Sequence, residues 1–108
     1  MSMALDEVFN APARLQIAAI LARADEAEFA IIRDIVDVSD SVLSKHLSTL
    51  SEAGYVVIKK APRGGRQRTW AALTSKGRRA FREHVKALQD MIAVADEKFD
   101  EAAAGSPA

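Results

Sequence analysis

The stretch from residue 38 to residue 77, VSDSVLSKHLSTLSEAGYVVIKKAPRGGRQRTWAALTSKG, constrains the fold more than any other part of the chain. Its first half carries leucines at the spacing of one helix face: Leu43, Leu47 and Leu50. Ser39 or Asp40 can cap the start of this helix, and Gly54 follows as its C-terminal stop. The sequence therefore predicts an amphipathic helix that ends at Ala53.

The second half of this stretch has the pattern of a β-hairpin followed by a helix. Tyr55–Lys60 is rich in β-branched residues, Pro62–Gly65 is a turn cluster, and Gln67–Leu73 is the expected returning strand. Thr74 then caps a long final helix, predicted over Ser75–Phe99. This order of helix, glycine stop, hairpin and helix is the order of a winged helix-turn-helix.

Two more helices are predicted before this stretch, over Pro12–Ala24 and Ala27–Val36, with a shorter helical segment over Ala4–Phe9. The expected fold class is α+β and mostly α: a winged helix-turn-helix made of a three-helix bundle, a β-hairpin wing and a long C-terminal dimerisation helix. A chain of 108 residues is one domain's worth, so we expect residues 1–100 to form one winged-helix domain with terminal dimerisation segments. Residues 101–108 are expected to be a flexible tail.

The composition excludes several classes of function. The chain has no cysteine, which removes disulfides, thiolate zinc sites and cysteine nucleophiles. Its neighbouring carboxylates have no nucleophile or base beside them, so we expect neither an enzyme nor a bound cofactor. No apolar run reaches the length of a membrane span, about 18 residues, and the N-terminus lacks a signal core, so a cytoplasmic protein is expected.

The formal net charge is zero, but the charges are segregated along the chain. Residues 1–54 hold four Lys/Arg and nine Asp/Glu, a net of −5. Residues 55–86 hold ten Lys/Arg and only Glu83, a net of +9, and residues 87–108 hold Lys98 against five acids, a net of −4. A basic stripe of this density is typical of a protein with a polyanionic partner. A solvated charged surface is the alternative.

The third helix has a polar face that suits contact with DNA. If the leucine stripe faces the core, the opposite face carries small hydroxyls and Lys45, which can reach a guanine edge or a phosphate. Val42 can contact a thymine methyl. Glu52, on the same outer face, opposes DNA contact, as does Asp40 unless it caps the helix or accepts from a cytosine. The predicted DNA contacts on this helix are Ser39, Asp40, Ser41, Val42, Ser44, Lys45 and Thr49. An ordinary amphipathic helix is the alternative.

The tip of the predicted hairpin, RGGRQR, places arginines around two glycines. Glycine permits the turn and removes bulk where a loop presses into a groove, and arginine binds phosphates and narrow minor grooves. The predicted DNA contacts of this wing are Lys60, Arg63, Gly64, Gly65, Arg66 and Arg68. A basic solvated turn is the alternative.

The last helix carries an apolar seam with spacings of 4, 3, 4, 3 and 4: Phe81, Val85, Leu88, Ile92, Ala95 and Phe99. A 3.5-residue repeat is typical of a helix that packs along another helix. Phe81 and Val85 are expected to pack on the domain's own core, which leaves the distal half for a second subunit. The predicted dimer interface is Leu5, Val8, Phe9, Leu88, Ile92, Ala95 and Phe99.

The remaining polar residues with a distinctive chemistry do not indicate a further site. His84 has no second histidine nearby on its helix, so no metal ligand set is expected. His46 is expected either to pack or to contact a phosphate, and Arg14 either to pair with an acid inside a dimer or to touch a phosphate. Trp70 is expected in the core of the returning strand.

The run SDSVLSKHLSTLSEAGYVVIKKAPRGGRQRTWAALTSKGRRAF resembles the winged-helix transcriptional regulators of the MarR type, most of all their compact single-domain relatives, and more loosely the ArsR group. The leading FNAPARLQIAAIL matches the start of those compact members. The resemblance implies that Ser39–Ala53 is the recognition helix, that Lys60–Arg68 is the wing, and that the protein is a homodimeric repressor or activator.

Two features depart from the larger MarR proteins. The wing lacks their acidic-arginine-arginine tip, so which arginine enters the minor groove stays open. The chain is also too short for the flanking helices where many of them bind a phenolic ligand, so no effector is identified. The expected function is sequence-specific binding of a homodimer to a pseudo-palindromic operator in double-stranded DNA, and the alternative is a protein–protein interaction module.

Overall fold

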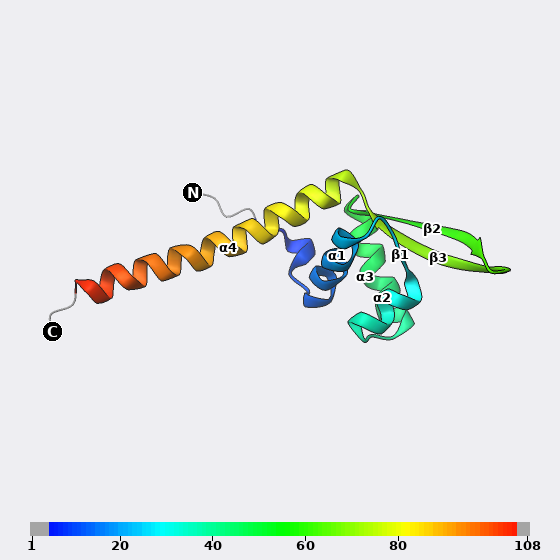
Figure 1. The fold of residues 1–108 in the computed structure, drawn as a ribbon, viewed down its shortest axis with the longest axis horizontal. Coiled ribbons are helices and arrows are strands. Elements are labelled where there is room, and N and C mark those ends of the chain that lie inside the picture. Colours follow the sequence, from blue (N-terminus) through cyan, green and yellow to red (C-terminus); the bar gives the residue numbers. More distant parts are fainter. Residues whose placement is uncertain (1–4, 106–108) are drawn as a thin grey trace.

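The computed structural model describes residues 5–105, which form four α-helices and a three-stranded antiparallel sheet (Figure 1). The elements in chain order are a 3₁₀ helix η1 (Glu7–Phe9), α1 (Pro12–Arg23), β1 (Ala27–Glu28), α2 (Phe29–Val36), α3 (Asp40–Glu52), β2 (Val56–Arg63), β3 (Arg66–Leu73) and α4 (Ser75–Ala104). This order confirms the predicted mostly α architecture of a helix bundle, a hairpin and a long C-terminal helix.

The molecule is elongated because two elements leave the bundle in opposite directions. Figure 1 shows α1, α2 and α3 grouped in the middle, with the β2–β3 hairpin extending to one side and α4 to the other. The principal extents are 71 × 25 × 21 Å. The 30 residues of α4 account for much of this length, since a helix rises about 1.5 Å per residue.

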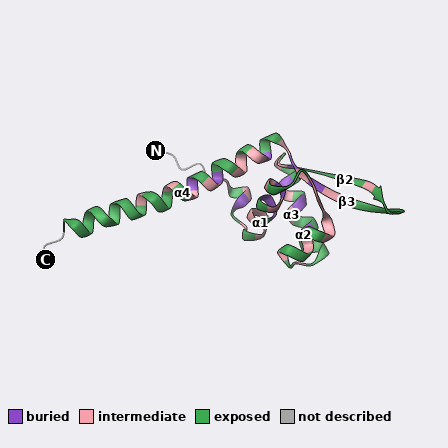
Figure 2. Ribbon diagram, in the orientation of Figure 1, coloured by how far each residue is buried: buried purple, intermediate pink, exposed green. Residues whose placement is uncertain are grey.

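The core lies between the three bundle helices and the inner ends of β2 and β3 (Figure 2). The leucine stripe of α3 is completely buried there, as its periodicity predicted. The buried apolar side chains are Phe9, Ile17, Ala18, Leu21, Ile32, Leu43, Leu47, Leu50, Val56, Ala71 and Leu73. The outer halves of the hairpin and of α4 contribute nothing to this core, and both are exposed in Figure 2.

The hairpin is longer and its turn tighter than the sequence predicted. The β2–β3 register runs from Val56 opposite Leu73 to Arg63 opposite Arg66, so the turn consists of two glycines alone. Their φ angles, +61° and +78°, are those of a type I′ turn, whose twist matches the strands and which favours glycine at both positions. The prediction of a turn over residues 62–65 is therefore wrong for its first two residues, which belong to β2.

A third strand was not anticipated. Ala27 and Glu28 form β1 and pair with Ala71 and Trp70 of β3, so the strand order is β1-β3-β2. The helix predicted from Ala27 consequently begins at Phe29. A strand of two residues is too short to show the alternating pattern of a strand in the sequence. Ala27 and Glu28 are extended because they pair with the open edge of β3.

Both ends of the described chain also differ from expectation. Of the segment Ala4–Phe9, only Glu7–Phe9 is helical, and Ala4 lies outside the described residues. At the other end α4 continues past Phe99 to Ala104, so residues 101–104 are not the expected flexible tail, while residues 106–108 lie outside the description. No helix in the range 5–105 is long and apolar enough to span a membrane.

A close contact between backbones fixes the start of α4 against the end of α3. Thr74 donates its hydroxyl to the carbonyl of Gly54 at 2.7 Å and its backbone N–H to the carbonyl of Tyr55 at 3.0 Å. The same hydroxyl accepts the N–H of Gly77 at 2.9 Å. A Cβ on Gly77 would lie only 2.1 Å from the Tyr55 carbonyl oxygen, so this approach requires glycine.

Replacing this glycine should destabilise the whole domain. We expect Gly77→Ala to lower the free energy of unfolding by about 1–3 kcal/mol, because backbone atoms rather than a flexible side chain must move aside. Gly105→Ala is the matched control, since its Cβ would meet no atom nearer than 3.4 Å. Urea unfolding followed by circular dichroism measures both, and equal midpoints for the two variants would contradict the close contact.

The tyrosine at this corner should make stability depend on alkaline pH. Tyr55 donates its hydroxyl to Asp6, and this hydrogen bond, followed by burial, raises the pKa of Tyr55 from 10.0 to about 12. A raised folded-state pKa stabilises the fold below pH 10, and that contribution disappears as the pH rises towards 12. Urea midpoints measured from pH 9 to pH 11.5 should fall more steeply for the wild type than for Tyr55→Phe; parallel curves would refute this linkage.

Candidate nucleic-acid interface

Helix α3 starts at a side-chain cap. The Oγ of Ser39 accepts a hydrogen bond from the backbone N–H of Val42 at 3.2 Å and lies 3.2 Å from the Oγ of Ser41. The cap satisfies one of the free N–H groups of the first turn. Of the two predicted capping residues, the structure selects Ser39, while Asp40 occupies the first turn of the helix.

The outer face of α3 is open to solvent. Opposite the buried leucines, its exposed side chains are Ser41, Val42, Ser44, Lys45, Ser48 and Glu52. The side chain of Lys45 makes no ion pair or hydrogen bond with any residue in the range 5–105. Short hydroxyl side chains and one unpaired cation therefore form the middle of this surface, and the exposed acids Asp40 and Glu52 lie at the two ends of the helix.

Thr49, predicted on the same surface, is less available than its neighbours. Its hydroxyl donates to the backbone carbonyl of Lys45 at 3.1 Å, and the residue is half-buried. The hydroxyl hydrogen is thus committed to the helix itself. Thr49 can still accept a hydrogen bond, but it is not a free donor.

An arginine that the sequence did not single out links α2 to α3. Arg33 pairs through Nη1 with Asp40 at 3.0 Å and through Nε with Asp34 at 3.1 Å. The hydrogen bonds to Asp40 and then to Asp34 raise the pKa of Arg33. Between the helices, Asp37 adopts a left-handed φ of 60°, which makes the connection tight. Since Asp40 is already paired with a cation, its repulsion of a polyanion is reduced.

Two basic side chains of the hairpin are paired with acids at its base. The Nζ of Lys59 lies 3.0 Å from Glu26 Oε2, and the Nη1 of Arg68 lies 2.7 Å from Glu28 Oε1. Glu28 is the more enclosed of the two acids, with 18% of its side chain exposed. Because Glu28 belongs to β1, the strand missed from the sequence supplies the partner of a predicted wing arginine. Arg68 is thus tied to the sheet rather than extended towards a partner.

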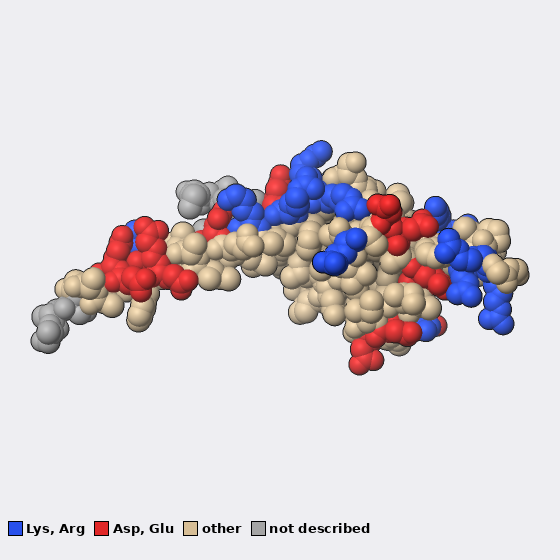
Figure 3. Space-filling view, in the orientation of Figure 1, with Lys and Arg blue, Asp and Glu red and all other residues tan. Residues whose placement is uncertain are grey.

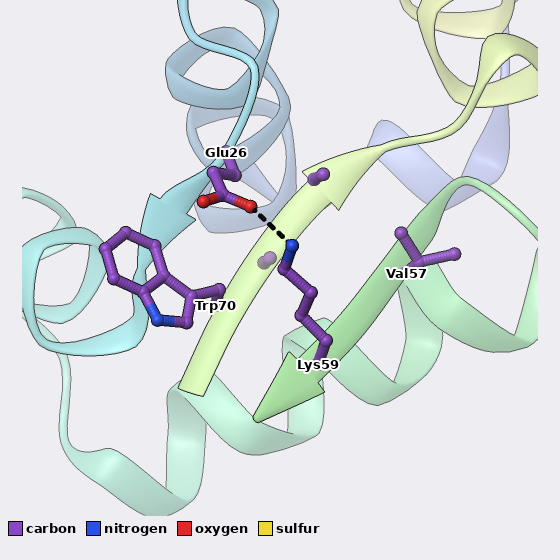
Figure 4. A pocket seen from close by; sticks show the side chains of 6 residues that line it. Glu26, Val57, Lys59 and Trp70 are labelled. Carbon is purple, nitrogen blue, oxygen red and sulfur yellow. Dashed lines mark ion pairs between the residues drawn. The ribbon is translucent and has the colours of Figure 1, made fainter. Parts of the chain in front are cut away.

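Trp70 lies half-buried on the outer surface of the sheet, so its assignment to the core is wrong. The register places it opposite Lys59, and the guanidinium of Arg63 lies 4.5 Å from its ring centroid. Trp70 and Lys59 line a small pocket together with Glu26 and Val57, as Figure 4 shows. The volume of this pocket is about 80 Å³. This volume holds a few water molecules, and the cation–π contact holds Arg63 against the sheet.

The remaining two cations of the predicted wing are unpaired. Among the residues that the structure describes, the side chains of Lys60 and Arg66 make neither an ion pair nor a hydrogen bond. Arg66 also lines an open groove of about 340 Å³ between the first half of β3 and the first turn of α2. The groove is lined by Glu28, Phe29, Ala30, Arg66, Gln67, Arg68 and Thr69.

The surface separates charge by region. Figure 3 shows basic side chains over the hairpin and the first half of α4, with acidic side chains at the base of the hairpin and on the distal end of α4. The segment 55–86, which carries ten Lys/Arg against Glu83, thus contributes the basic surface. This separation gives a neutral chain a region attractive to polyanions.

His46 and Arg14 hold two helices together. The Nε of Arg14 donates to the Val8 carbonyl at 2.6 Å, and its Nη1 lies 3.4 Å from Nδ1 of His46. Burial and, secondarily, the charge of Arg14 lower the pKa of His46. A neutral imidazole that accepts at Nδ1 fits both observations. Of the alternatives left by the sequence, this contact supports packing for His46 and gives Arg14 a backbone partner inside the protomer.

His84 and Phe9 are core residues at the N-terminal side of α4. His84 is 3% exposed, and its Nδ1 accepts the backbone N–H of Asp6 at 3.0 Å. Phe9 is 2% exposed, and its ring stacks on Tyr55 at a centroid distance of 5.5 Å and meets Phe81 edge-on at 6.1 Å. The prediction that Phe9 belongs to the dimer interface is therefore wrong, because its ring is buried in the protomer's own core. No cluster of three potential metal ligands occurs in the described part of the chain.

The other residues predicted for the dimer interface retain accessible surface. Val8 and Leu88 are half-buried, and Leu5 is 42% exposed. Ile92 and Phe99 are 63% and 72% exposed. Ala95 is also exposed, as is Met91, which the seam did not include. No residue in the range 5–105 covers this apolar strip on α4.

The missed residues left little signal in the sequence. Arg33 stands seven positions before Asp40, but the pairing depends on the tight turn at Asp37. Glu26 and Glu28 carry no sign of a partner in the sequence, and only the return of β3 beside them makes them partners of the hairpin.

Comparison with known proteins identifies the fold. A model of the winged helix DNA-binding domain matches residues 13–92. An uncharacterised protein of Methanocaldococcus jannaschii is 34% identical over 79 residues, which cover 73% of this chain and 86% of that protein.

Solved structures of regulators share this fold. A transcriptional regulator homologue from Pyrococcus horikoshii superposes with a TM-score of 0.79 at 25% identity, covering 84% of this chain and 90% of that one. The zinc-responsive MarR family member ZitR of Lactococcus lactis superposes with a TM-score of 0.62 at 22% identity, covering 94% of this chain and 69% of that one. NadR in complex with 4-hydroxyphenylacetate superposes with a TM-score of 0.68 at 20% identity, covering 89% of this chain and 67% of that one. With its exposed α3 and its basic hairpin, the chain belongs to the winged helix DNA-binding domain family and has the fold of MarR-type transcriptional regulators.

Proposed function

We propose that the protein is a sequence-specific transcriptional regulator that binds a pseudo-palindromic operator as a homodimer. The observation that carries the proposal is the combination of a capped α3 with an exposed polar face and unpaired cations at the hairpin, both fixed to one bundle. A helix and a loop held rigidly to one body can contact a major groove and the adjacent backbone together.

In this proposal α3 enters the major groove. Its exposed hydroxyls, those of Ser41 and Ser44, are short enough for the backbone to approach the base edges, and Lys45 extends to a guanine or a phosphate. Val42, 39% exposed, offers an apolar contact to a thymine methyl. Ser39 contributes through the cap that orients the first turn, and Asp40 through its pair with Arg33.

The hairpin contacts the backbone or the minor groove next to it. Arg66 and Lys60 are the cations with no competing partner, so they are the ones we assign to phosphates or the minor groove. Gly64 and Gly65 keep the turn narrow. The contacts of Arg63 and Arg68 with Trp70 and Glu28, respectively, instead set the position of the hairpin.

The homodimer is supported by the apolar strip of α4, formed by the half-buried Leu88 and the exposed Met91, Ile92, Ala95 and Phe99. Exposed apolar surface of this extent marks a site of association. An isologous dimer would present two α3 helices to successive major grooves, about 34–36 Å apart.

Removal of Lys45 from α3 and removal of Arg66 from the hairpin should affect DNA binding differently. We expect Lys45→Ala to reduce the preference for operator over scrambled DNA. Arg66→Ala should instead weaken binding to operator DNA and to scrambled DNA alike. It should also lower the slope of log K against log salt by about one per contact, or about two per dimer. Fluorescence anisotropy at two salt concentrations measures this, with Lys98→Ala on the acidic end of α4 as the control. Affinity that is unaffected by Arg66→Ala would favour the protein-interaction alternative.

The acid that holds the wing should restrain non-specific binding. We expect Glu28→Gln to raise affinity for scrambled DNA about threefold while lowering the operator preference, since it frees Arg68 and removes a negative charge beside the groove. Asp25→Asn is the matched control, because Asp25 is an exposed acid in the same segment and has no ion pair within residues 5–105. If both variants bind alike, Glu28 has no role in positioning the wing.

A further inference from the structure

The two halves of α4 differ in what they contact. Gly77, His84 and Ala87 are buried against the protomer's own bundle, and Phe81 packs beside them. Beyond Leu88 the helix leaves the bundle, and Figures 1 and 2 show its distal half extended and exposed. A second copy that packs along α4 therefore finds the distal half open and the first half covered on one side.

The same two halves carry opposite charges. Residues 75–86 hold five Lys/Arg and one acid, Glu83, for a net of +4. Residues 87–105 hold five acids and one cation, Lys98, for a net of −4. Figure 3 shows the basic half next to the bundle and the acidic side chains at the far end.

This charge pattern distinguishes the two ways in which a pair of α4 helices can align. A parallel pair would place acidic half against acidic half and basic half against basic half, which is unfavourable. It would also bury apolar surface only along the distal halves, where the acids gather. An antiparallel pair places each acidic half beside the basic half of the other copy.

The seam sets the register of the antiparallel pair. With the crossing point near residue 90, Phe81 of one copy faces Phe99 of the other, Val85 faces Ala95, and Leu88 faces Ile92. Phe81 and Val85 are only half-buried by the bundle, so each keeps an accessible edge for the partner. Every exposed apolar side chain of the seam thereby meets an apolar side chain.

One ion pair follows from this register. Arg82 and Asp96 each directly follow a seam residue, Phe81 and Ala95, so both lie on the same flank of the seam. Both are exposed, and neither has an ion pair in the described range. In the antiparallel register Arg82 of one copy comes opposite Asp96 of the other, and the two-fold axis makes this pair twice.

We propose that two copies of this chain associate through α4 in an antiparallel arrangement that crosses near residue 90 and is aligned by the Arg82–Asp96 pairs. The proposal rests on the homodimer of the proposed function and adds its orientation and register. In this arrangement the exposed end of each α4 reaches the first half of the partner's helix, beside the accessible Leu5.

Disulfide cross-linking tests the orientation directly, because the chain has no cysteine of its own. We expect Arg82→Cys mixed with Asp96→Cys to give a covalent dimer on oxidation, while Asp96→Cys alone stays uncross-linked. In the antiparallel register two copies of residue 96 stand about 18 Å apart along the axis, far beyond the reach of a disulfide. Cross-linking of Asp96→Cys with itself would indicate a parallel pair and overturn the proposal.

Charge exchange tests the register without oxidation. Arg82→Asp should raise the dimer dissociation constant about tenfold, since two attractions become repulsions, and adding Asp96→Arg should restore it. Arg79→Asp is the matched control, because it makes the same charge change on the face of α4 away from the seam. Failure of the double exchange to restore affinity would contradict the pairing.

Light scattering coupled to size exclusion separates this inference from the proposed function. A monomer would overturn both the orientation and the homodimer. A dimer that binds operator but cross-links as a parallel pair would overturn the orientation alone. A dimer with the expected cross-link that binds no DNA would support the orientation and contradict the proposed function.

Discussion

The rest of the structure depends on the close approach of Gly77 to the carbonyl of Tyr55. Four elements meet at this corner: α3 ends, β2 begins, β3 ends and α4 begins. The hydroxyl of Thr74 holds the corner by bonding to both sides of it, at 2.7 Å and 2.9 Å. Because the corner is made of backbone contacts, the angles between α3, the hairpin and α4 cannot relax independently. The surface that suits DNA and the helix that suits a partner are therefore parts of one rigid frame.

Electrostatics divide the basic residues into two groups with different tasks. Lys59 and Arg68 are neutralised by acids at the base of the hairpin, and Arg63 is held against Trp70. Lys60 and Arg66 stay unpaired within the described residues. The paired cations hold the hairpin in position, and the unpaired cations can attract a polyanion. Overall neutrality is thus compatible with a local surface that attracts DNA.

The N-terminal segment shows why apolar residues are harder to assign than helices. Leu5, Val8 and Phe9 look alike in the sequence as candidates for an interface. In the fold, Asp6 turns the segment onto α4 through Tyr55 and His84, and this places Phe9 in the core while Leu5 stays exposed. The surface against which each apolar side chain packs is set by residues far away in the chain. Local periodicity carries no information about those residues.

The sequence by itself determined the elements whose signals are local: the leucine stripe of α3, a cap at Ser39 or Asp40, the glycines of the turn, the Thr74 cap and the segregation of charge. From these the winged-helix order and the exposed face of α3 could be predicted, as could the seam on α4. Only the tertiary structure decided the strand β1, the burial of Phe9 and the half-buried position of Trp70 on the outer surface of the sheet. It also decided which arginines are free, because each pairing joins segments that are distant in sequence. Local spacing fixes periodicity and caps, whereas partners across the fold are chosen by packing.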